Sequence, residues 1–201
     1  MQEVSLDELK EIITNSKDNL IANANSLSRN ACVYLHWSAG HYNQYYEDYH
    51  VNISKEGKYF ISTDDLSEVL AHTWKRNTGA IGIALACCAG ATSNDLGDEP
   101  PTSEQIEAMS LLTAWVCKIL EIPCDIQHIM THGEAADNED GYFGAYGEDD
   151  EYGPKHTCER WDLEYLDTTE SPKYDPYATD GSRGGDVLRG KANYYLNLIT
   201  G

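Results

Sequence analysis

The sequence CVYLH at residues 32–36 is a short run of mostly apolar, strand-forming residues. It is followed directly by WSAGHYNQYYEDYH at residues 37–50, whose polar residues and glycine end the run. A short apolar run bounded by turn-forming residues is typical of a buried β-strand. We therefore expect a strand that carries His36 to a loop at its carboxyl end.

Three further segments have the composition of β-strands. Residues 80–88 form a continuous apolar run, which is typical of a central strand covered on both faces. The segment YHVNISKEGKYFIS, residues 49–62, alternates around a Lys-Glu-Gly turn and predicts a β-hairpin. The run DIQHIM, residues 125–130, predicts another short strand that ends close to His132. Together these segments predict a sheet with residues 80–88 near its middle.

Two capping patterns mark the starts of helices. Ser5 is followed three residues later by Glu8, and this capping box opens a helix predicted over residues 5–17. Thr102 and Gln105 have the same spacing and open a second helix, whose apolar residues recur at helical intervals. The first helix carries no candidate for chemistry, so we interpret it as a leader packed on the rest of the chain.

The remaining segments are less regular in composition. Residues 64–70 form a polar, helix-like stretch, and residues 185–199 regain helical spacing. Residues 167–183 are rich in Pro, Thr, Ser, Asp and Gly and predict an irregular tail. Residues 137–153 are acidic and rich in Gly and Tyr, which is typical of a surface loop.

The overall composition argues against several classes of protein. The chain has 201 residues with 14 Lys and Arg against 34 Asp and Glu, and its net charge of -20 disfavours nucleic acid as a partner. No apolar stretch reaches the about 20 residues needed to cross a bilayer. The N-terminal sequence MQEVSLDELKEII lacks the basic start and apolar core of a secretory signal, so we expect synthesis in the cytoplasm.

The six cysteines do not have the spacing of a disulfide framework. Most of them lie in apolar runs, where a reduced cysteine behaves as a small core residue. We expect structural thiols at the first five, which are Cys32, Cys87, Cys88, Cys117 and Cys124.

Two predicted strands each bring a histidine to the following loop, and these are His36 and His132. Strand ends in open sheets are where ligand sites gather. Catalytic zinc usually takes three protein ligands and leaves the fourth position to water, so a third donor is required. Cys158 and Asp162 in the sequence HTCERWDLEYL both qualify.

Six blocks of this sequence occur in the order found in one family of enzymes. They are VYLHWSAG (33–40), DYHVNISKEGKYF (48–60), AHTWKRNTGAIGIAL (71–85), PTSEQIEAMSLLTAWV (101–116), IMTHGEAAD (129–137) and ERWDLEYL (159–166). In these blocks the chain resembles the zinc-dependent N-acetylmuramoyl-L-alanine amidases of the type 2 amidase and peptidoglycan recognition family, and in particular the endolysin-like amidases of phages and prophages. The resemblance implies an α/β fold, in which a central mixed β-sheet is flanked by helices in a single domain.

The resemblance also implies a zinc site. By their positions in the family motifs, His36 and His132 are zinc ligands. The third ligand of the family follows a basic residue by two positions, and the sequence RWD at residues 160–162 makes Asp162 that ligand. Arg160 is then the basic residue that helps to stabilise the oxyanion.

One alternative to Asp162 stays open. Some phage relatives use a cysteine as the third ligand, in a Lys-x-Cys arrangement shortly before a Phe-Asp-Leu sequence. Lys155 and Cys158 precede Trp-Asp-Leu in this chain, with one extra residue between them. The sequence favours Asp162 and leaves Cys158 as the second candidate.

Tyr49 belongs to the family's Tyr-His pair, and this position implies that it polarises the attacking water or the tetrahedral intermediate. Several bacterial members carry a glutamate as general base where this chain has Ala84, so the base must come from elsewhere. Glu134 lies just after His132 and is a candidate for proton transfer. An exposed loop carboxylate is more often simply solvated, however.

The family's loop that lines the substrate cleft matches His72, Trp74 and Asn77, which implies contact with the glycan or the stem peptide. The linker before Tyr49 is short where many members insert a helix, which opens one wall of the groove. An aromatic side chain half buried under a loop would explain Trp74 equally well.

The implied reaction is hydrolysis of the amide that joins N-acetylmuramic acid to L-alanine in peptidoglycan. Zinc suits this reaction because it lowers the pKa of bound water toward about 7 and polarises the carbonyl. A non-catalytic module that binds peptidoglycan is the second hypothesis, and an immune or toxin partner with this fold is a third. A lytic enzyme without a secretory signal would reach the cell wall after release or export.

We expect three segments in the chain. Residues 1–30 are the helical leader, residues 31–166 the catalytic domain, and residues 167–201 an irregular tail with a C-terminal helix. The last segment is too short for a typical wall-binding domain.

The acidic loop suggests a second cation site, because calcium prefers several oxygen ligands. Its spacing does not match an EF-hand, and a solvated loop is the simpler interpretation. The carboxylates concerned are Asp137, Glu139, Asp140, Glu148, Asp149, Asp150 and Glu151.

Overall fold

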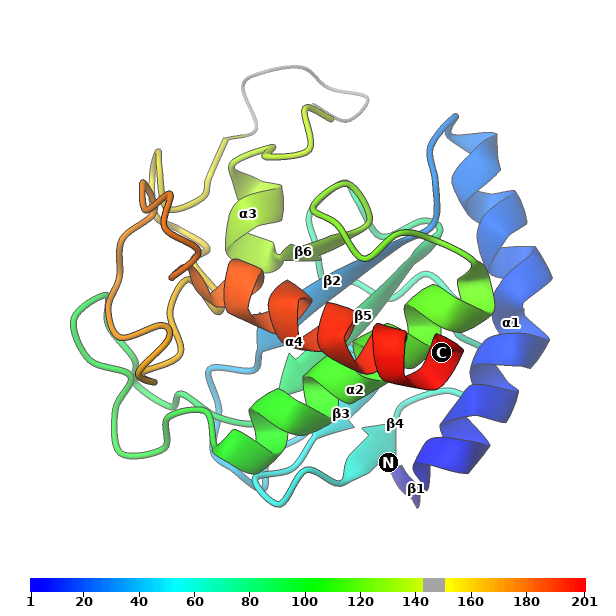
Figure 1. The fold of residues 1–201 in the computed structure, drawn as a ribbon, viewed down its shortest axis with the longest axis horizontal. Coiled ribbons are helices and arrows are strands. Elements are labelled where there is room, and N and C mark those ends of the chain that lie inside the picture. The colour runs from blue at the N-terminus through cyan, green and yellow to red at the C-terminus, as the bar shows by residue number, and fades with distance from the viewer. Residues whose placement is uncertain (143–150) are drawn as a thin grey trace.

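The computed structural model describes residues 1–142 and 151–201, which form a mixed β-sheet with helices packed on it (Figure 1). The strands are β1 (Gln2–Val4), β2 (Cys32–Trp37), β3 (Val51–Ile53), β4 (Tyr59–Ile61), β5 (Ala80–Leu85) and β6 (Ile129–Thr131). Their order in the sheet is β1-β4-β3-β5-β2-β6. β2 pairs in parallel with β5 and β6, β3 pairs in parallel with β5, and the pairs β1–β4 and β3–β4 are antiparallel.

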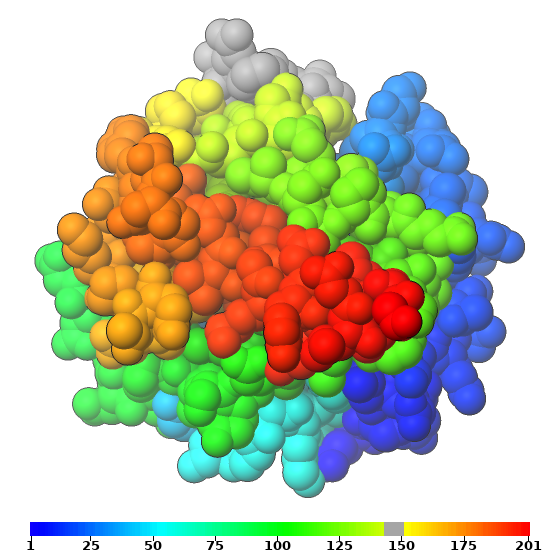
Figure 2. Space-filling view, viewed as in Figure 1, coloured from blue at the N-terminus to red at the C-terminus, as the bar shows by residue number. Residues whose placement is uncertain are grey.

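The helices of the described part are α1 (Leu6–Ser26), α2 (Ser103–Leu120), α3 (His132–Ala136) and α4 (Gly184–Thr200). α2 and α4 pack against each other in front of the sheet in Figure 1, and α1 contacts α2. Figure 2 shows α4 on the surface of this face. Among the described residues, no helix combines the length and the apolar character needed to cross a membrane.

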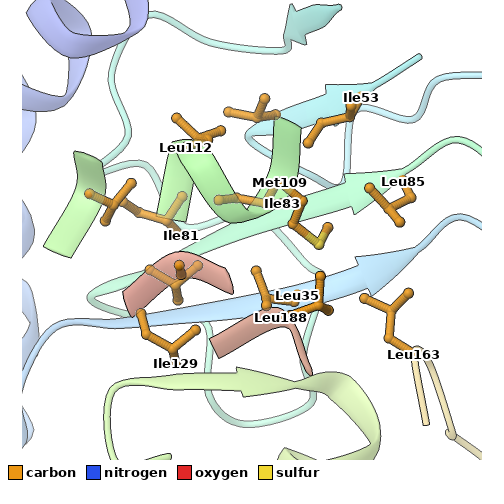
Figure 3. Close-up of a cluster of buried hydrophobic side chains, with 14 of the residues drawn as sticks. Leu35, Ile53, Ile81, Ile83, Leu85, Met109, Leu112, Ile129, Leu163 and Leu188 are labelled. Atoms are coloured by element: carbon orange, nitrogen blue, oxygen red, sulfur yellow. The ribbon is translucent and has the colours of Figure 1, made fainter. Parts of the chain in front are cut away.

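The core lies where the central strands meet α2 and α4. All six residues of both β2 and β5 are buried. Leu35 and Ile83 of these strands cluster with Met109 of α2 and Leu188 of α4 (Figure 3). Because burial of a large aliphatic side chain contributes about 1.5–3 kcal/mol, this cluster holds the central strands firmly in place.

Most of the predicted elements are confirmed. Ser5 and Thr102 are N-caps with complete capping boxes, and the predicted hairpin is formed by β3 and β4. β5 lies in the middle of the sheet, the five predicted structural cysteines are buried free thiols, and the tail before α4 is irregular. α1 continues to Ser26, beyond its predicted end at residue 17.

Two predictions of secondary structure are wrong for the same physical reason. Residues 64–70 form turns and bends rather than a helix, and the strand predicted over residues 125–130 begins only at Ile129. At each place an aspartate, Asp65 or Asp125, accepts a hydrogen bond from the backbone N–H two residues further on. Such a local turn competes with regular structure.

Candidate metal centre

Three side chains from distant parts of the sequence meet at the carboxyl ends of β2 and β6. His36 is the penultimate residue of β2, and His132 is the first residue of α3, directly after β6. The parallel pairing of Leu35 with Thr131 places the two histidines side by side, with ring centroids 4.8 Å apart. Asp162 reaches them from a turn, with its Oδ2 3.3 Å from His36 Nδ1 and 3.5 Å from His132 Nδ1.

This trio has the donor set of a zinc site. Each of the three residues is buried and offers one ligand atom, and these atoms lie within 4.8 Å of one another. Two atoms that each bind a tetrahedral zinc ion at about 2.1 Å lie roughly 3.4 Å apart, which is close to the two separations from Asp162. Two imidazoles and one carboxylate therefore fit a single shared ion.

The surroundings keep His36 and Asp162 in the ionisation states that bind a metal. Burial lowers the pKa of His36 to about 4, so its imidazole is neutral at neutral pH. Burial alone would raise the pKa of Asp162, but its electrostatic interactions and hydrogen bonds with His132 and His36 outweigh this effect and hold the pKa well below its ordinary value. Neutral imidazole and ionised carboxylate are the forms that ligate zinc.

The ring nitrogens that face away from Asp162 have partners of their own. His36 Nε2 lies 3.3 Å from His72 Nδ1 and 3.4 Å from Thr73 Oγ1, and His132 Nε2 lies 3.4 Å from the Tyr152 hydroxyl. Such contacts fix the tautomer and orientation of a ligating imidazole. Sequence reasoning missed Thr73 and Tyr152, because neither stands in a pattern that distinguishes it from its neighbours.

His72 packs edge-on against His36, and the His72 side chain is buried. A Cβ at Gly82 would come within 2.6 Å of His72 Cγ, so only a glycine leaves room for this ring. Asn77 Oδ1 accepts hydrogen bonds from the backbone N–H groups of His72 and Thr73 and fixes the loop. His72 and Asn77 thus shape the wall of the site, and their contact with substrate stays a prediction.

Two adjoining cavities of about 590 and 410 Å³ open beside the trio. His132 and Arg160 line both of them. Trp74 lines the larger cavity and is 62% exposed, so it is not packed under a loop. Tyr49 and Asp162 line the smaller one. The volumes are those of ordinary ligand sites.

Tyr49 and Arg160 border the smaller cavity with two different donors. The Tyr49 ring lies 4.9 Å from the His36 ring between centroids, and its hydroxyl donates to the Trp37 carbonyl oxygen at 3.5 Å. Burial, reinforced by the charge of Asp162, raises the pKa of Tyr49, so the hydroxyl stays protonated. Arg160 is exposed at the rim of the cleft. A hydroxyl and a guanidinium are therefore available next to the trio.

The alternative third ligand points elsewhere. Cys158 Sγ lies 3.2 Å from the Tyr174 hydroxyl, and the converging group found among the described residues does not include it. Lys155, the basic residue of that alternative, forms an ion pair with Glu139. The structure thus brings Asp162 to the two histidines, and not Cys158.

The expectation of a solvated Glu134 is wrong. This residue belongs to α3, is 1% exposed, and accepts the Thr131 backbone N–H through Oε2 at 2.9 Å. Its two carboxylate oxygens also accept hydrogen bonds from Arg189 at 2.6 and 2.7 Å. Glu134 is therefore fully engaged in structure, and Ala84 in β5 offers no carboxylate in its place.

Residues 137–153 are only in part a surface loop, because Asp137 and Asn138 are buried. Three of the carboxylates considered for calcium, Glu148, Asp149 and Asp150, lie outside the described residues. The other four pair with basic side chains: Asp137 and Glu151 with His156, Glu139 with Lys155 and Arg183, and Asp140 with Arg76. These pairs tie the segment to the rest of the chain.

A buried His-His-Asp trio at the edge of a mixed sheet, beside an open cleft, is the arrangement of a candidate zinc hydrolase. The sequence model of the N-acetylmuramoyl-L-alanine amidase family matches residues 15–145, and the chain belongs to this family. His36 and His132 lie inside the matched range, whereas Asp162 lies beyond it.

No curated protein matches the chain. Among solved structures, the chain is similar to the endolysin N-acetylmuramoyl-L-alanine amidase LysCS from Clostridium intestinale URNW, with 19% identity and a TM-score of 0.38. This match covers 51% of the present chain and 68% of the other.

Proposed function

We propose that this chain is a zinc-dependent N-acetylmuramoyl-L-alanine amidase, which hydrolyses the amide between N-acetylmuramic acid and L-alanine in peptidoglycan. The convergence of His36, His132 and Asp162 beside an open cleft is the observation that carries the proposal. Membership of the amidase family supplies the identity of the bond. The protein would then be a bacteriolytic enzyme of phage or prophage type that meets the cell wall after release or export.

The three ligands have complementary parts in this proposal. A bound zinc ion supplies Lewis acidity, which activates a water molecule and polarises the amide carbonyl. His36 and His132 contribute neutral nitrogens, and Asp162 contributes the single negative charge of the trio, so the occupied site keeps a net positive charge toward the substrate. The partners of the outer ring nitrogens keep both imidazoles oriented while the substrate binds.

Tyr49 and Arg160 are the proposed catalytic residues. The protonated hydroxyl of Tyr49 can donate a hydrogen bond to the carbonyl oxygen as negative charge develops on it. Arg160 adds a positive charge at the rim of the same cavity. Donors of this kind typically accelerate an acyl transfer by about 10²- to 10³-fold each.

We further propose that three residues of the cleft bind the substrate. Trp74 presents an exposed indole, which suits the apolar face of a sugar ring or the stem peptide. His72 and Asn77 line the same cavity as this indole and His132. In this proposal residues 31–166 carry the catalytic domain, on which residues 1–30 and 167–201 pack.

A digest of purified peptidoglycan tests the proposal against its alternative, a module that binds peptidoglycan without cutting it. Mass spectrometry should detect stem peptides with a free L-alanine amino group and glycan strands of unchanged length. A chelator should stop their release, and added zinc should restore it. Binding of peptidoglycan by zinc-loaded protein without any released peptide would contradict the proposal and favour the binding module.

A further inference from the structure

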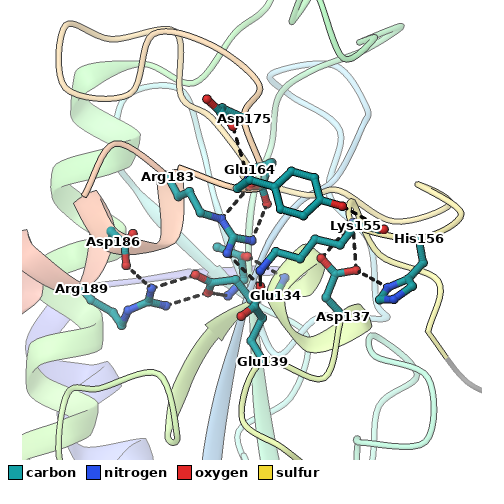
Figure 4. Close-up of polar contacts among 12 residues, drawn as sticks. Glu134, Asp137, Glu139, Lys155, His156, Glu164, Asp175, Arg183, Asp186 and Arg189 are labelled. Carbon is teal, nitrogen blue, oxygen red and sulfur yellow. Dashed lines mark hydrogen bonds and ion pairs between the residues drawn. The ribbon is translucent and has the colours of Figure 1, made fainter. Parts of the chain in front are cut away.

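Two arginines near the C-terminus, Arg183 and Arg189, are each 7% exposed, and the proposed reaction uses neither. Figure 4 shows both pointing into a group of acidic side chains between α3 and α4. A buried charge is costly unless it is well paired and hydrogen-bonded. The contacts of these two guanidinium groups therefore indicate which parts of the chain they hold in place.

Arg189 of α4 connects the residues on both sides of His132. Its Nη1 and Nη2 donate to the two carboxylate oxygens of Glu134 at 2.6 and 2.7 Å. Nη1 also donates to the carbonyl oxygen of Ile129 in β6 at 3.1 Å. Glu134 in turn accepts the backbone N–H of Thr131 at 2.9 Å. One guanidinium thus links the end of β6 to the helix that His132 begins.

Arg183, the N-cap of α4, holds the turn that carries Asp162. Its Nε and Nη2 donate to the two carboxylate oxygens of Glu164 at 2.7 and 3.0 Å. The backbone N–H of Gly184 donates to the carbonyl oxygen of Glu164 at 2.9 Å. Glu164 is two residues from Asp162. These contacts therefore fix the turn through both the side chain and the backbone of Glu164.

The first turn of α4 fits closely against both segments. A Cβ at Gly184 would overlap the carbonyl oxygen of Leu163, and a Cβ at Gly185 would overlap the carboxylate of Glu134. Only glycines allow this approach. The two arginine contacts are therefore part of a close-packed junction rather than isolated surface pairs.

We infer that Arg183 and Arg189 are positioning residues of the metal centre, an inference that rests on the proposed function. His36 is held by the register of the sheet, but His132 begins a helix of 5 residues and Asp162 lies in a turn. A functional site requires its groups to be held within about 0.5 Å. The two buried arginines supply this constraint from outside the family match at residues 15–145.

The variants Arg183→Lys and Arg189→Lys test the inference, because lysine keeps the charge but cannot reproduce a forked contact. Zinc affinity is measured by competition with a chromophoric chelator, and the absorption spectrum of the Co²⁺ protein reports the coordination geometry. The His36→Ala variant, measured in the same way, shows how much zinc is bound by groups outside the proposed site. Each lysine variant should bind zinc about 10- to 100-fold more weakly and change the Co²⁺ spectrum.

Lys191→Met is the matched control. Lys191 is also on α4, and its ion pair with Glu107 of α2, at 2.6 Å, touches neither ligand-bearing segment. This variant should keep the parental zinc affinity and Co²⁺ spectrum even if its melting temperature falls.

Two outcomes would overturn the inference. If the folded lysine variants keep the parental zinc affinity and Co²⁺ spectrum, both arginines form structural ion pairs only and do not position the metal centre. This holds whatever the melting temperatures of the variants. Should a lysine variant not fold, the acidic partner of that arginine is substituted instead. Glu134→Gln then stands in for Arg189→Lys and Glu164→Gln for Arg183→Lys, and the same two readouts are measured. A parental protein that binds no zinc through His36 would overturn the proposed function together with the inference, so the two failures are distinguishable.

Discussion

Asp162 Oδ2 lies 3.3 Å from His36 Nδ1, although 126 positions separate the two residues in the sequence. Their neighbours Trp161 and Trp37 pack edge to face, with ring centroids 4.4 Å apart. This aromatic contact brings the turn that carries Asp162 to the edge of the sheet. The candidate metal centre therefore depends on tertiary packing between β2 and the C-terminal quarter of the chain.

Removal of either histidine should abolish both metal binding and catalysis. We expect His36→Ala and His132→Ala to retain no zinc at this site and to release no stem peptide, because two remaining ligands hold the ion weakly. Metal analysis and the peptidoglycan digest measure the two effects, and circular dichroism verifies the fold. Full activity in either folded variant would refute the assignment of that ligand.

The third ligand can be identified by comparing two variants. Asp162→Asn keeps the size of the side chain but removes its charge, and we expect a loss of zinc affinity of at least about 10-fold. Cys158→Ser should retain the parental affinity, because its Sγ faces Tyr174. The reverse result in the same chelator competition would make Cys158 the ligand.

Tyr49 and Arg160 should affect the rate without affecting the metal. We expect Tyr49→Phe and Arg160→Gln each to lower kcat by about 10²- to 10³-fold with unchanged zinc content. Tyr177→Phe is the control, because Tyr177 is 69% exposed and does not line either cavity of the cleft. Parental kcat in the Tyr49 and Arg160 variants would remove both residues from the mechanism.

His50 should contribute to a loss of stability in acid. Its ring is buried, Nδ1 accepts the Gly82 backbone N–H at 3.0 Å, and Nε2 donates to the Glu68 carbonyl oxygen at 2.9 Å. Burial lowers the pKa of His50 below its ordinary value of 6.5. Since the folded pKa is the lower one, this stabilisation is present above the unfolded pKa and is lost as the pH falls through the folded pKa.

The variant His50→Gln isolates this contribution. Denaturant titrations of the parental protein and the variant between roughly pH 7 and pH 5 give the free energy of unfolding at each pH. The variant should lose less of its stability over this range, because it no longer has a buried imidazole to protonate. Equal losses in the two proteins would contradict the prediction.

Gly82 should be essential to the arrangement around His36. Gly82→Ala places a methyl group against the His72 ring, and we expect weaker zinc binding and a loss of about 1–3 kcal/mol in the free energy of unfolding. Gly190→Ala is the control, since the space around Gly190 in α4 is open and alanine favours a helix by about 1 kcal/mol. Parental zinc affinity in Gly82→Ala would show that the ring can move without consequence.

The sequence predicted those features that local physics determines. Capping boxes at Ser5 and Thr102 depend on residues three positions apart, and the apolar run before His36 is a local signal for a buried strand. By contrast, neighbouring residues alone do not decide whether Asp162 or Cys158 is the third ligand. Positive φ angles at Cys158 and Leu163, 57° and 59°, set the path of the turn, and no short pattern predicts them at non-glycine residues.

The burial of Glu134 was missed for a related reason. Its partner Arg189 lies 55 positions further along the chain, and only the packing of α4 against α3 brings the two together. Tyr152 likewise becomes a partner of His132 only through the tertiary fold. Residues that support the candidate site from a distance therefore required the structure, whereas the two strand-end histidines could be identified from the sequence.

The central claim is that His36, His132 and Asp162 together hold one zinc ion. Crystals of the zinc-loaded protein, measured on both sides of the zinc absorption edge, test it most directly. An anomalous difference peak between these three side chains is the predicted result. A zinc peak at other residues, with none between these three, would contradict the account.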